Sequence, residues 1–259
     1  MEEPTLLSAT VLLVRDGAQG LEVWVQERVS TMPDYPGMTV FPGGRVDERD
    51  RIGEHSGDRD VWAGSSADNA ARVLGTDTHA ARGLVFAAVR ELFEETGTLL
   101  AVHPNGATVG DASPYHGERL ALESHRLSLT DVLATNDLRV HSGLLHPWAR
   151  WVGTSEKGRV FDTYSFLAVH PVGQEPDGAS PEADSAGWFS PRLLIEGWRH
   201  GLVRLVIPTW AQLMRLSRCA TVAEAVAEAE TSDMTPVVGA PRHDPQYHEF
   251  YATTFHERI

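Results

Sequence analysis

Three glutamates and one arginine stand close together in residues 90–97, which read Arg-Glu-Leu-Phe-Glu-Glu-Thr-Gly. If this segment is an α-helix, with about 100° of rotation per residue, Glu91, Glu94 and Glu95 share one face. Like charges four residues apart repel each other, and a hard divalent cation with oxygen ligands would relieve that repulsion. A solvated acidic helix face is the plain alternative. The spacing therefore marks Glu91, Glu94 and Glu95 as candidate metal ligands, beside Arg90.

The helix that carries these residues is expected to be amphipathic. Apolar positions recur opposite the glutamates, so one face can pack on a core while the carboxylates look outward. Gly97 can end the helix. Upstream, residues 41–44 read Phe-Pro-Gly-Gly, and Gly43 and Gly44 would let the backbone come close to a metal site and its substrate. An ordinary turn is the competing interpretation of the two glycines.

These residues resemble the signature of the Nudix hydrolases, which is G, five residues, E, seven residues, then R-E-U-x-E-E-x-G-U with U a bulky aliphatic residue. Residues 90–97 match its second half, and only the last U departs, as Thr98. Gly44 fits the opening glycine, but Asp50 stands where the signature has glutamate. Between Gly44 and Arg90 lie 45 residues where the signature has 13, so the segment between its two halves is much longer.

A long insertion at this place resembles the branch of the family that contains the peroxisomal coenzyme A diphosphatases. Residues 160–166 are similar to the F-D-T-x-F-F strand of that branch, and residues 146–151 resemble the segment before it. The likeness covers most of residues 6–216. It implies an α/β (α+β) fold, the Nudix α/β/α sandwich with a mixed β-sheet. The expected organisation is one domain over residues 1–259, with an insertion at 48–79 and a helical extension and tail at 201–259.

The resemblance also implies roles for the site residues. Glu91, Glu94 and Glu95 would bind Mg²⁺ or Mn²⁺, and Glu94 and Glu95 would take part in catalysis while Arg90 braces the glutamates. Glu182 stands where the branch has a loop acid near the metals, so it is a candidate general base. Asp184 or a helix glutamate could act instead, and a plain acidic surface loop is about as well supported.

Substrate choice depends on residues before the signature. Coenzyme A diphosphatases carry a stretch resembling R-[SA]-x3-R-x3-G-x3-F-P-G-G, and Arg28, Gly37 and residues 41–44 keep its spacing. Val29 replaces the small residue and Pro33 replaces the second arginine, and the loss of a cation weakens this interpretation for a phosphate-rich ligand. Arg28 could hold a phosphate or be an ordinary surface residue. The expected substrate is coenzyme A or acyl-coenzyme A; alternatives are NADH, ADP-ribose or another nucleotide, or a non-catalytic ligand-binding regulator.

The composition of the chain argues against nucleic-acid and membrane partners. The net charge of −14 argues against a nucleic-acid groove, since phosphate backbones are bound through basic patches. No apolar run approaches the roughly 18 residues that a membrane span requires. Residues 1–4 lack the basic start of a signal peptide, and Cys219, the one cysteine in the chain, cannot form an internal disulfide. A cytoplasmic enzyme with a small nucleotide-derived substrate, and with no nucleic-acid or membrane partner, is expected.

The periodicity predicts the main elements. Residues 6–14 and 21–27 are expected to form a hairpin, with further strands at 148–152 and 160–169 and a loop at 177–184. Helices are expected at 67–74, 120–136, 191–200, from Pro208 to Cys219, and after a Thr221 cap through Glu230. These elements imply a mixed sheet with helices on its faces.

Aromatic residues raise two further questions. Trp148, Trp151 and Tyr164 could stack on an adenine, although aromatic residues in strands are more often core. The tail 235–259 contains three histidines and four aromatic residues, namely His243, His248, His256, Tyr247, Phe250, Tyr251 and Phe255. So much aromatic surface suggests docking, either on its own domain or across a homodimer. Metal binding by the histidines has little support, because their spacing fits no known site.

Overall fold

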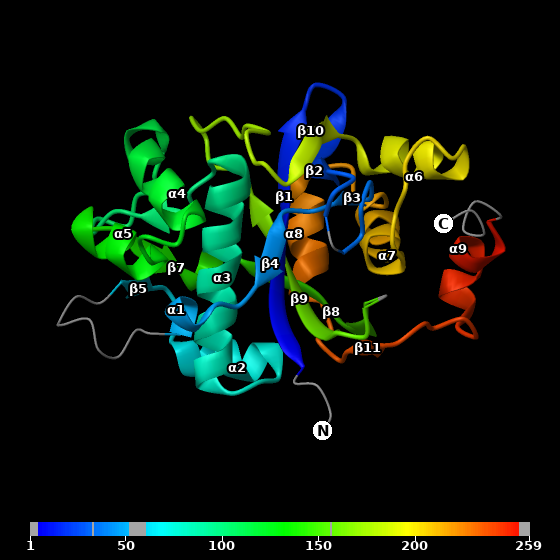
Figure 1. Ribbon diagram of the computed structural model, residues 1–259, viewed down its shortest axis with the longest axis horizontal. Helices are drawn as coiled ribbons and strands as arrows, with labels where there is room; N and C mark the ends of the chain where they lie inside the picture. The colour runs from blue at the N-terminus through cyan, green and yellow to red at the C-terminus, as the bar shows by residue number, and fades with distance from the viewer. Residues whose placement is uncertain (1–4, 33, 52–60, 156, 254–259) are drawn as a thin grey trace.

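A mixed β-sheet stands between two layers of helices (Figure 1). The computed structural model describes residues 5–32, 34–51, 61–155 and 157–253. Residues 1–4, Pro33, part of the predicted insertion at 52–60, and Phe255 and His256 lie outside the described residues. The strands of the central sheet are β1 (Leu6–Gly17), β2 (Gly20–Arg28), β3 (Thr39–Val40), β4 (Gly43–Arg45), β8 (His146–Thr154), β9 (Val160–Val169), β10 (Ala183–Phe189) and β11 (Val237–Val238).

The central sheet follows the order β10-β2-β1-β9-β8-β11, with β3 paired to β2 and β4 paired to β1. Strands β1 and β2 form the predicted antiparallel hairpin, which closes at Gly17 and Gly20. Strand β9 instead runs parallel to β1, so the sheet is mixed. Strand β4 pairs antiparallel with β1, with Gly43 opposite Thr10. This pairing fixes the two glycines of the Phe-Pro-Gly-Gly turn at the centre of the sheet.

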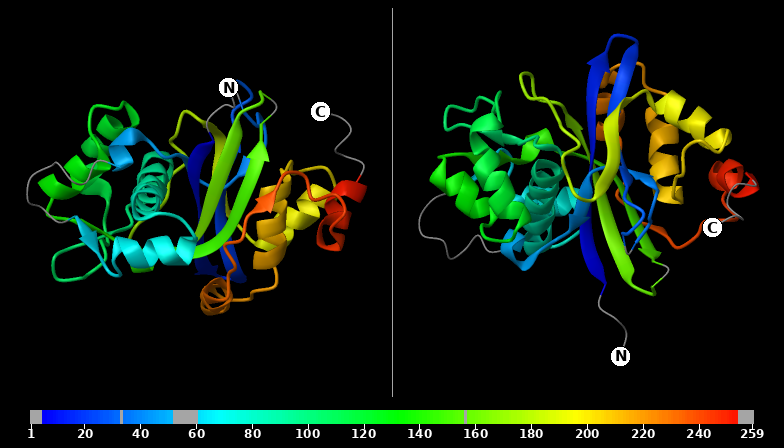
Figure 2. Two further views of the ribbon diagram at one scale, coloured as in Figure 1. Left: turned by 90° about the horizontal axis from the view of Figure 1, so that it is seen from below. Right: turned by 45° about the horizontal axis from the view of Figure 1, so that its top comes forward.

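Helices cover both faces of the sheet, as the two turned views in Figure 2 also show. On one side lie α1 (Glu48–Arg51), α2 (Ala67–Leu74), α3 (Thr78–Thr96), α4 (His116–Glu123) and α5 (Leu129–Thr135), with a small sheet of β5 (Trp62–Ala63), β6 (Ala101–Val102) and β7 (Arg139–His141). On the other side lie α6 (Pro191–Arg199), α7 (Ile207–Leu216), α8 (Val222–Glu230) and α9 (His248–Ala252). Short 3₁₀ turns occur at Ser113–Tyr115, Ser142–Leu144 and Pro245–Tyr247.

Each side of the sheet has its own hydrophobic core. Side chains alternate along β1, so Ala9, Val11 and Leu13 enter the core with α3, while Leu12 and Val14 enter the core with α7 and α8. Burying each of the larger aliphatic side chains contributes about 1.5–3 kcal/mol. A central strand that is covered on both faces needs such a continuous apolar run. These findings confirm the predicted α/β/α sandwich.

The glutamate-bearing helix α3 is more deeply buried than its sequence predicted. Asp77 caps its start by accepting a hydrogen bond from the Ala80 N–H, and Gly97 ends it with a left-handed backbone, φ 74°, as expected. The expectation of an outward-looking acidic face is wrong, because Glu95 is only 5% exposed. Helices α1, α2 and α4 pack around α3 on the side away from the sheet. The carboxylates are therefore largely shielded from water, with Glu91 and Glu94 side chains 14% and 12% exposed.

Most predicted elements are confirmed, with two differences. Helix α2 and strand β9 have the expected bounds, and Thr221 caps α8 as expected. The single helix predicted at 120–136 is wrong, because α4 ends at Glu123 and α5 begins only at Leu129. Between them His125 adopts a left-handed backbone that no helix can contain. The loop predicted at 177–184 ends earlier, since Ala183 begins β10.

The described part of the tail docks on its own chain. The Tyr247 ring packs edge-on against Trp151, with ring centroids 5.7 Å apart, and Phe250 stacks on Trp198 at the same separation. His243 and His248 are exposed. In the ranges that the structure describes, no helix combines the length and apolar character needed to cross a membrane.

Candidate functional site

Arg90 is the centre of the acidic cluster at the end of α3. Its guanidinium is only 4% exposed, and it forms two hydrogen bonds with Asp50, 2.8 and 2.9 Å long. Its Nη1 also donates to Glu91 at 2.8 Å and to Glu94 at 3.3 Å. Burial alone would lower the pKa of Arg90, but Asp50, Glu91 and Glu94 together raise it. Arg90 is therefore charged and contacts three carboxylates, of which Glu91 and Glu94 are two of the predicted ligands.

Asp50 occupies the place that the Nudix signature gives to glutamate. It lies in α1, and its side chain is 1% exposed. One oxygen accepts from the Asp47 N–H at 2.8 Å, while both oxygens face Arg90. The side chain of Asp50, although shorter than glutamate, thus contacts Arg90 directly. The long insertion between the two halves of the signature does not separate them.

Glu95 points into the sheet rather than outward. Gln26 of β2 donates to its Oε2 at 2.6 Å, and the Gly43 N–H donates to the same oxygen at 3.1 Å. Burial raises the pKa of Glu95 well above its usual range, and the charges of Glu91 and Glu182 raise it further. Sequence reasoning missed Gln26. A buried amide in the apolar strand 20–28 was the available signal.

The two glycines of the upstream turn leave room for different neighbours, Gly44 for Glu91 and Gly43 for strand β1. A Cβ on Gly44 would lie 2.5 Å from Cδ of Glu91, and a Cβ on Gly43 would lie 2.7 Å from Cα of Thr10. Gly43 also has φ 155°, which disfavours any side chain. Burial raises the pKa of Glu91 to about 7; Arg90 opposes this effect and the charge of Glu94 adds to it. Of the two glycines, Gly44 is therefore the one whose missing side chain leaves space for a glutamate.

Two further candidate residues meet at the edge of the cluster. Nη2 of Arg28 lies 3.6 Å from Oε2 of Glu182, and Nε of Arg28 donates to the Asp34 carbonyl at 3.2 Å. The Glu182 side chain is 46% exposed, and its charge is among those that raise the pKa of Glu95. The structure thus brings Arg28 and Glu182 together beside the helix glutamates. Asp184, the alternative base, is exposed within β10.

The donor set fits a hard divalent cation. Oε1 of Glu94 is buried and has no hydrogen-bond partner among the described residues. Asp50, Glu91 and Glu94 contact the single charge of Arg90, so negative charge is in excess. Carboxylate oxygens are the ligands that Mg²⁺ and Mn²⁺ prefer. Across the described residues no three His, Cys, Asp or Glu side chains stand ready-made as a metal site. Arg90 instead donates hydrogen bonds to one oxygen each of Glu91 and Glu94, so a metal ion would have to share these carboxylates with Arg90.

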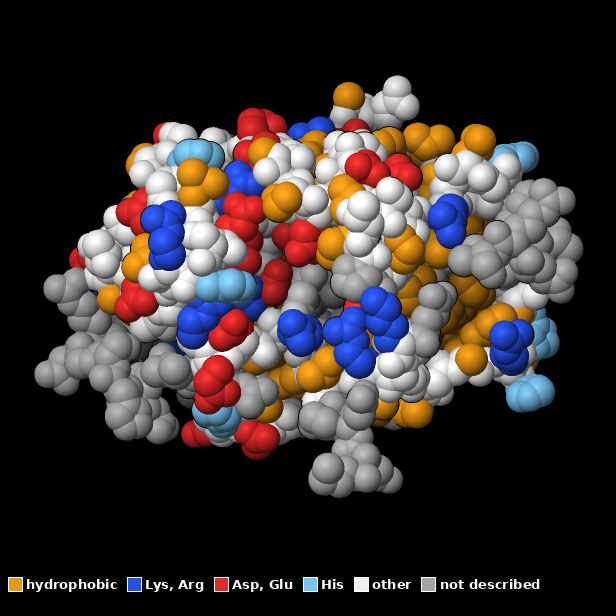
Figure 3. Space-filling view, in the orientation of Figure 1, with side chains coloured by type: hydrophobic (Ala, Val, Ile, Leu, Met, Phe, Trp, Pro, Cys, Tyr) orange, Lys and Arg blue, Asp and Glu red, His pale blue; other side chains and the backbone are white. Residues whose placement is uncertain are grey.

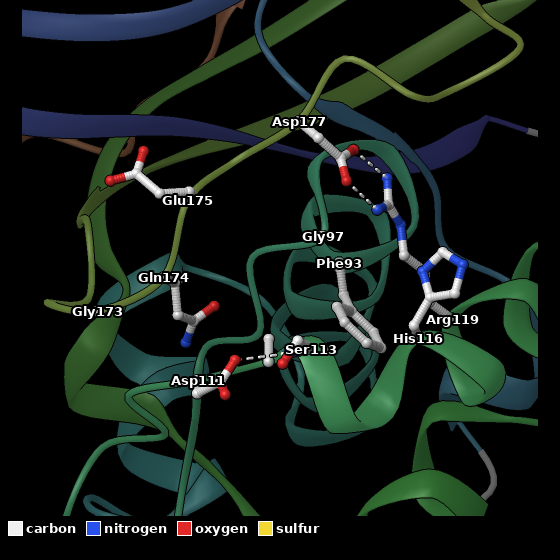
Figure 4. A pocket seen from close by; sticks show the side chains of 11 residues that line it. Phe93, Gly97, Asp111, Ser113, His116, Arg119, Gly173, Gln174, Glu175 and Asp177 are labelled. Carbon is white, nitrogen blue, oxygen red and sulfur yellow. Dashed lines mark hydrogen bonds and ion pairs between the residues drawn. The ribbon is translucent and has the colours of Figure 1, made fainter.

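Acidic side chains gather near the middle of the face shown in Figure 3, where it is hollowed, and basic and histidine side chains border them. A cavity of about 470 Å³ lies at the end of α3, within the size range of small-molecule sites. In Figure 4, Arg119 and Asp177 lie side by side on one wall of this cavity, next to Gly97, and are joined by hydrogen bonds. This cavity adjoins the acidic cluster through α3 itself.

Arg119 ties the loop that leads to Glu182 to the end of α3. It forms two hydrogen bonds with Asp177, 2.7 and 2.8 Å long, and its Nε donates to the Glu94 carbonyl at 3.1 Å. The Asp177 N–H donates to the Thr96 carbonyl at 2.8 Å. Sequence reasoning missed this pair, because its members are 58 residues apart and neither belongs to a motif.

The aromatic residues considered for adenine stacking belong to the core. Trp148 and Tyr164 are fully buried and Trp151 is 6% exposed, so none presents a free ring face. The guanidinium of Arg215 lies 4.0 Å from the Trp148 ring centroid, and Arg150 covers Tyr164. The idea that these three rings bind a nucleobase is therefore wrong.

Comparison with known proteins shows which solved structures share this fold. No protein-family model and no curated protein matches the sequence. Among solved structures, a Nudix hydrolase from Alicyclobacillus acidocaldarius is 28% identical, covers 88% of this chain and 97% of its own, and superposes with a TM-score of 0.71. The Nudix domain of Shewanella oneidensis NrtR, complexed with ADP-ribose, is 15% identical, covers 83% of this chain and 88% of its own, and has a TM-score of 0.44. A Caenorhabditis elegans Ap4A hydrolase in a binary complex is 13% identical over 83% of this chain and 96% of its own, with a TM-score of 0.43.

The chain has the fold of the Nudix hydrolases. The likeness to the Alicyclobacillus protein extends over nearly the whole of both chains, and the Arg90–Glu95 cluster stands at the end of α3. Together these findings support the Nudix superfamily, whose members hydrolyse diphosphates of nucleotide derivatives. The residues around the cluster must then decide the particular substrate.

Proposed function

We propose that this chain is a metal-dependent diphosphatase that hydrolyses the diphosphate linkage of a nucleotide derivative, with coenzyme A or acyl-coenzyme A as the leading candidate substrate. The observation that carries the proposal is the buried cluster of Glu91, Glu94 and Glu95 around Arg90, in which one Glu94 oxygen has no hydrogen-bond partner among the described residues. Such a cluster is unstable without a cation, since like charges in a low-dielectric place repel strongly.

Glu91, Glu94 and Glu95 would hold Mg²⁺ or Mn²⁺. When bound, such an ion stabilises the negative charge of a diphosphate and makes water more acidic. The chain's own residues prepare the ligands. Arg90 keeps the Glu91 and Glu94 carboxylates together, and Gln26 with the Gly43 N–H orients Glu95. Gly44 leaves the space that the Glu91 carboxylate needs.

Glu182 is the proposed general base. It borders the cluster, its side chain is 46% exposed, and Nη2 of Arg28 lies 3.6 Å from its Oε2. A carboxylate in this place can accept a proton from water within hydrogen-bond reach. Asp184 and the helix glutamates remain the alternatives, of which Asp184 is the more exposed.

Two observations bear on the substrate. The spacing of Arg28, Gly37 and the Phe-Pro-Gly-Gly turn supports coenzyme A, whereas Arg28 is already engaged by Glu182 and by the Asp34 carbonyl. A phosphate would have to compete with these partners. This engagement favours a second candidate, a substrate with fewer phosphates such as NADH or ADP-ribose. A regulator that binds such a ligand without hydrolysing it is the third, and the intact glutamate cluster speaks against it.

Product identification by mass spectrometry tests the proposal. The protein is incubated with Mg²⁺ or Mn²⁺ and, separately, with coenzyme A, acetyl-coenzyme A, NADH, ADP-ribose and nucleoside triphosphates. Adenosine 3′,5′-bisphosphate with 4′-phosphopantetheine would establish the leading candidate. AMP from NADH or ADP-ribose would establish the second, and no product from any of them would favour the regulator.

A pair of variants tests the role of the cluster. Glu94→Gln should nearly abolish turnover and weaken Mn²⁺ binding in calorimetric titration, because an amide is a poorer ligand for a hard cation. Glu230→Gln is the matched control, since Glu230 is exposed in α8 on the opposite side of the sheet. Full activity of Glu94→Gln would contradict the assignment.

A further inference from the structure

The end of helix α3 is closed by hydrogen bonds from two other parts of the chain. The last four carbonyl groups of an α-helix have no partner within the helix itself. Nε of Arg119, in α4, donates to the Glu94 carbonyl at 3.1 Å. The Asp177 N–H donates to the Thr96 carbonyl at 2.8 Å. Arg119 and Asp177 therefore both bind the helix turn that carries two of the proposed metal ligands.

Arg119 and Asp177 also bind each other tightly. The Arg119 side chain is only 6% exposed, and its two terminal nitrogens donate to the two Asp177 oxygens at 2.7 and 2.8 Å. A two-bond pair of this kind fixes orientation as well as distance. A Cβ on Gly97 would lie 2.8 Å from Nη1 of Arg119, so the end of α3 leaves room for the guanidinium. A cation also suits the negative end of a helix dipole.

The loop that leaves Asp177 is anchored at its two ends. At the far end the Val29 N–H, next to β2, donates to the Glu182 carbonyl at 3.0 Å. In the part of the chain that the structure describes, every hydrogen bond of residues 178–181 stays within residues 177–183. The loop thus spans from the end of α3 to the sheet, and Glu182 stands at its sheet end.

Strand β2 places the sheet end of this loop beside the glutamate cluster. Gln26 and Arg28 are two residues apart in β2, so their side chains point to the same face of the sheet. Gln26 donates to Oε2 of Glu95 at 2.6 Å, and Nη2 of Arg28 lies 3.6 Å from Oε2 of Glu182. Two residues of a strand span about 7 Å. Glu182 therefore meets β2 one side-chain position away from the residue that holds Glu95.

We propose that Arg119 and Asp177 are positioning residues for Glu182, the proposed general base. The proposal rests on the proposed function. The pair joins the loop to α3 at one end, while β2 holds it at the other, so together they set where Glu182 stands relative to the helix glutamates. A general base must lie within hydrogen-bond reach of the water that it deprotonates. Without the pair, the Glu182 carboxylate would be held from the sheet side alone.

The variant Asp177→Ala tests the proposal. A misplacement of about 1 Å can cost roughly a hundredfold in rate, and the bond from Val29 remains, so we expect kcat to fall about tenfold. KM and Mn²⁺ affinity should stay unchanged, because the helix glutamates keep their own partners. Asp177→Asn keeps an acceptor for Arg119 and for the Ala179 N–H, so its kcat should lie between those of the wild type and Asp177→Ala.

Glu249→Ala is the matched control. Glu249 accepts a hydrogen bond from Nε of Arg199 at 2.6 Å, so this pair also joins the end of one helix, α6, to a distant segment, α9. Both helices lie on the opposite side of the sheet from α3 (Figure 1). The variant should leave kcat unchanged. An equal fall of kcat in both variants would indicate a general loss of stability and would overturn the proposal.

A double-mutant cycle shows whether the pair acts through Glu182. Glu182→Gln should lower kcat by itself, because an amide cannot take a proton from water as a carboxylate does. Adding Asp177→Ala to Glu182→Gln should then change kcat little, since no base is left to misplace. A fall as large as the one in the wild-type background would overturn the proposal. Wild-type kcat in Glu182→Gln would also overturn it, and would leave the hydrolase intact.

Hydrogen exchange gives a readout that does not depend on turnover. In Asp177→Ala, the amides of residues 178–183 should exchange at least tenfold faster than in the wild type, while those of β2 stay protected. Glu249→Ala should show wild-type exchange in both segments. Unchanged exchange in Asp177→Ala would overturn the proposal. Faster exchange in a protein that turns over no substrate would refute the hydrolase and the catalytic role together, and would leave only the hold of the pair on the loop.

Discussion

The ion pair between Asp50 and Arg90 should be the most sensitive point of the site to mutation. Asp50→Asn keeps the size of the side chain but removes its charge, so one of two hydrogen bonds to a buried guanidinium is lost. Removing one partner of a buried ion pair typically costs about 3–5 kcal/mol. Arg90 retains Glu91, Glu94 and the Arg45 carbonyl as acceptors. We therefore expect a loss of about 2–3 kcal/mol, at or below the lower limit of that range.

Urea unfolding of the metal-free protein measures this loss. For a chain of this size, about 2–3 kcal/mol corresponds to a fall of the melting temperature by roughly 4–10 °C. Asp162→Asn is the control, because Asp162 forms a similar two-bond pair with Arg150, but the two side chains are 13% and 20% exposed. The control should lose only about 1 kcal/mol.

The same variant tests how the arginine and the metal share the glutamates. Without Asp50, the Arg90 guanidinium has only Glu91 and Glu94 as charged partners, so both carboxylates become less available to a cation. Mn²⁺ affinity should therefore fall in Asp50→Asn and stay unchanged in Asp162→Asn. Wild-type stability together with wild-type Mn²⁺ affinity in Asp50→Asn would refute the bracing role of this pair.

Two further predictions follow from the geometry. Gly44→Ala should push the Glu91 carboxylate aside, because the added Cβ would lie 2.5 Å from the Cδ of Glu91. Titration with Mn²⁺ should then show at least tenfold weaker binding. Unchanged Mn²⁺ affinity would mean that Glu91 is not a metal ligand. Partial burial raises the pKa of Asp177, but the hydrogen bonds from Arg119 and from the Ala179 N–H outweigh it and the net pKa is lowered. The stabilisation by Asp177 should therefore be complete above its unfolded pKa of 3.8 and be lost as the pH falls through the lower folded value. Urea unfolding of the wild type and of Asp177→Asn, measured from pH 6 to pH 3, should show that the two free energies of unfolding converge. A difference that stays constant with pH would disprove the linkage.

Local patterns predicted much of the fold. The hairpin, β9, α2 and the helices α6, α7 and α8 could be placed because periodicity and capping residues are local features. The glutamate cluster was found for the same reason, since its members lie within one and a half turns of α3. The prediction of one long helix at 120–136 was wrong at His125. A histidine in a left-handed helix cap gives no sequence signal, whereas a glycine in that position does.

The contacts that complete the site could not be predicted, because they join distant parts of the chain. Arg90 and Asp50 are 40 residues apart, and Gln26 and Glu95 are 69 residues apart. The helical periodicity of α3 shows which residues share a face, but not what covers that face. The burial of Glu95 depends on the register between β1 and β4, which brings the Gly43 N–H under the helix.

This burial explains why the cluster is suited to a cation. A carboxylate that is removed from water must be neutralised by a proton, by a cationic side chain or by a metal ion. Arg90 is shared by Asp50, Glu91 and Glu94, so its single charge cannot balance the cluster. Burial and the neighbouring carboxylates raise the pKa values of Glu91 and Glu95, so proton uptake is favoured where no metal is bound. A divalent ion would replace those protons, and the helices around α3, by keeping water away, make its attraction to the glutamates stronger.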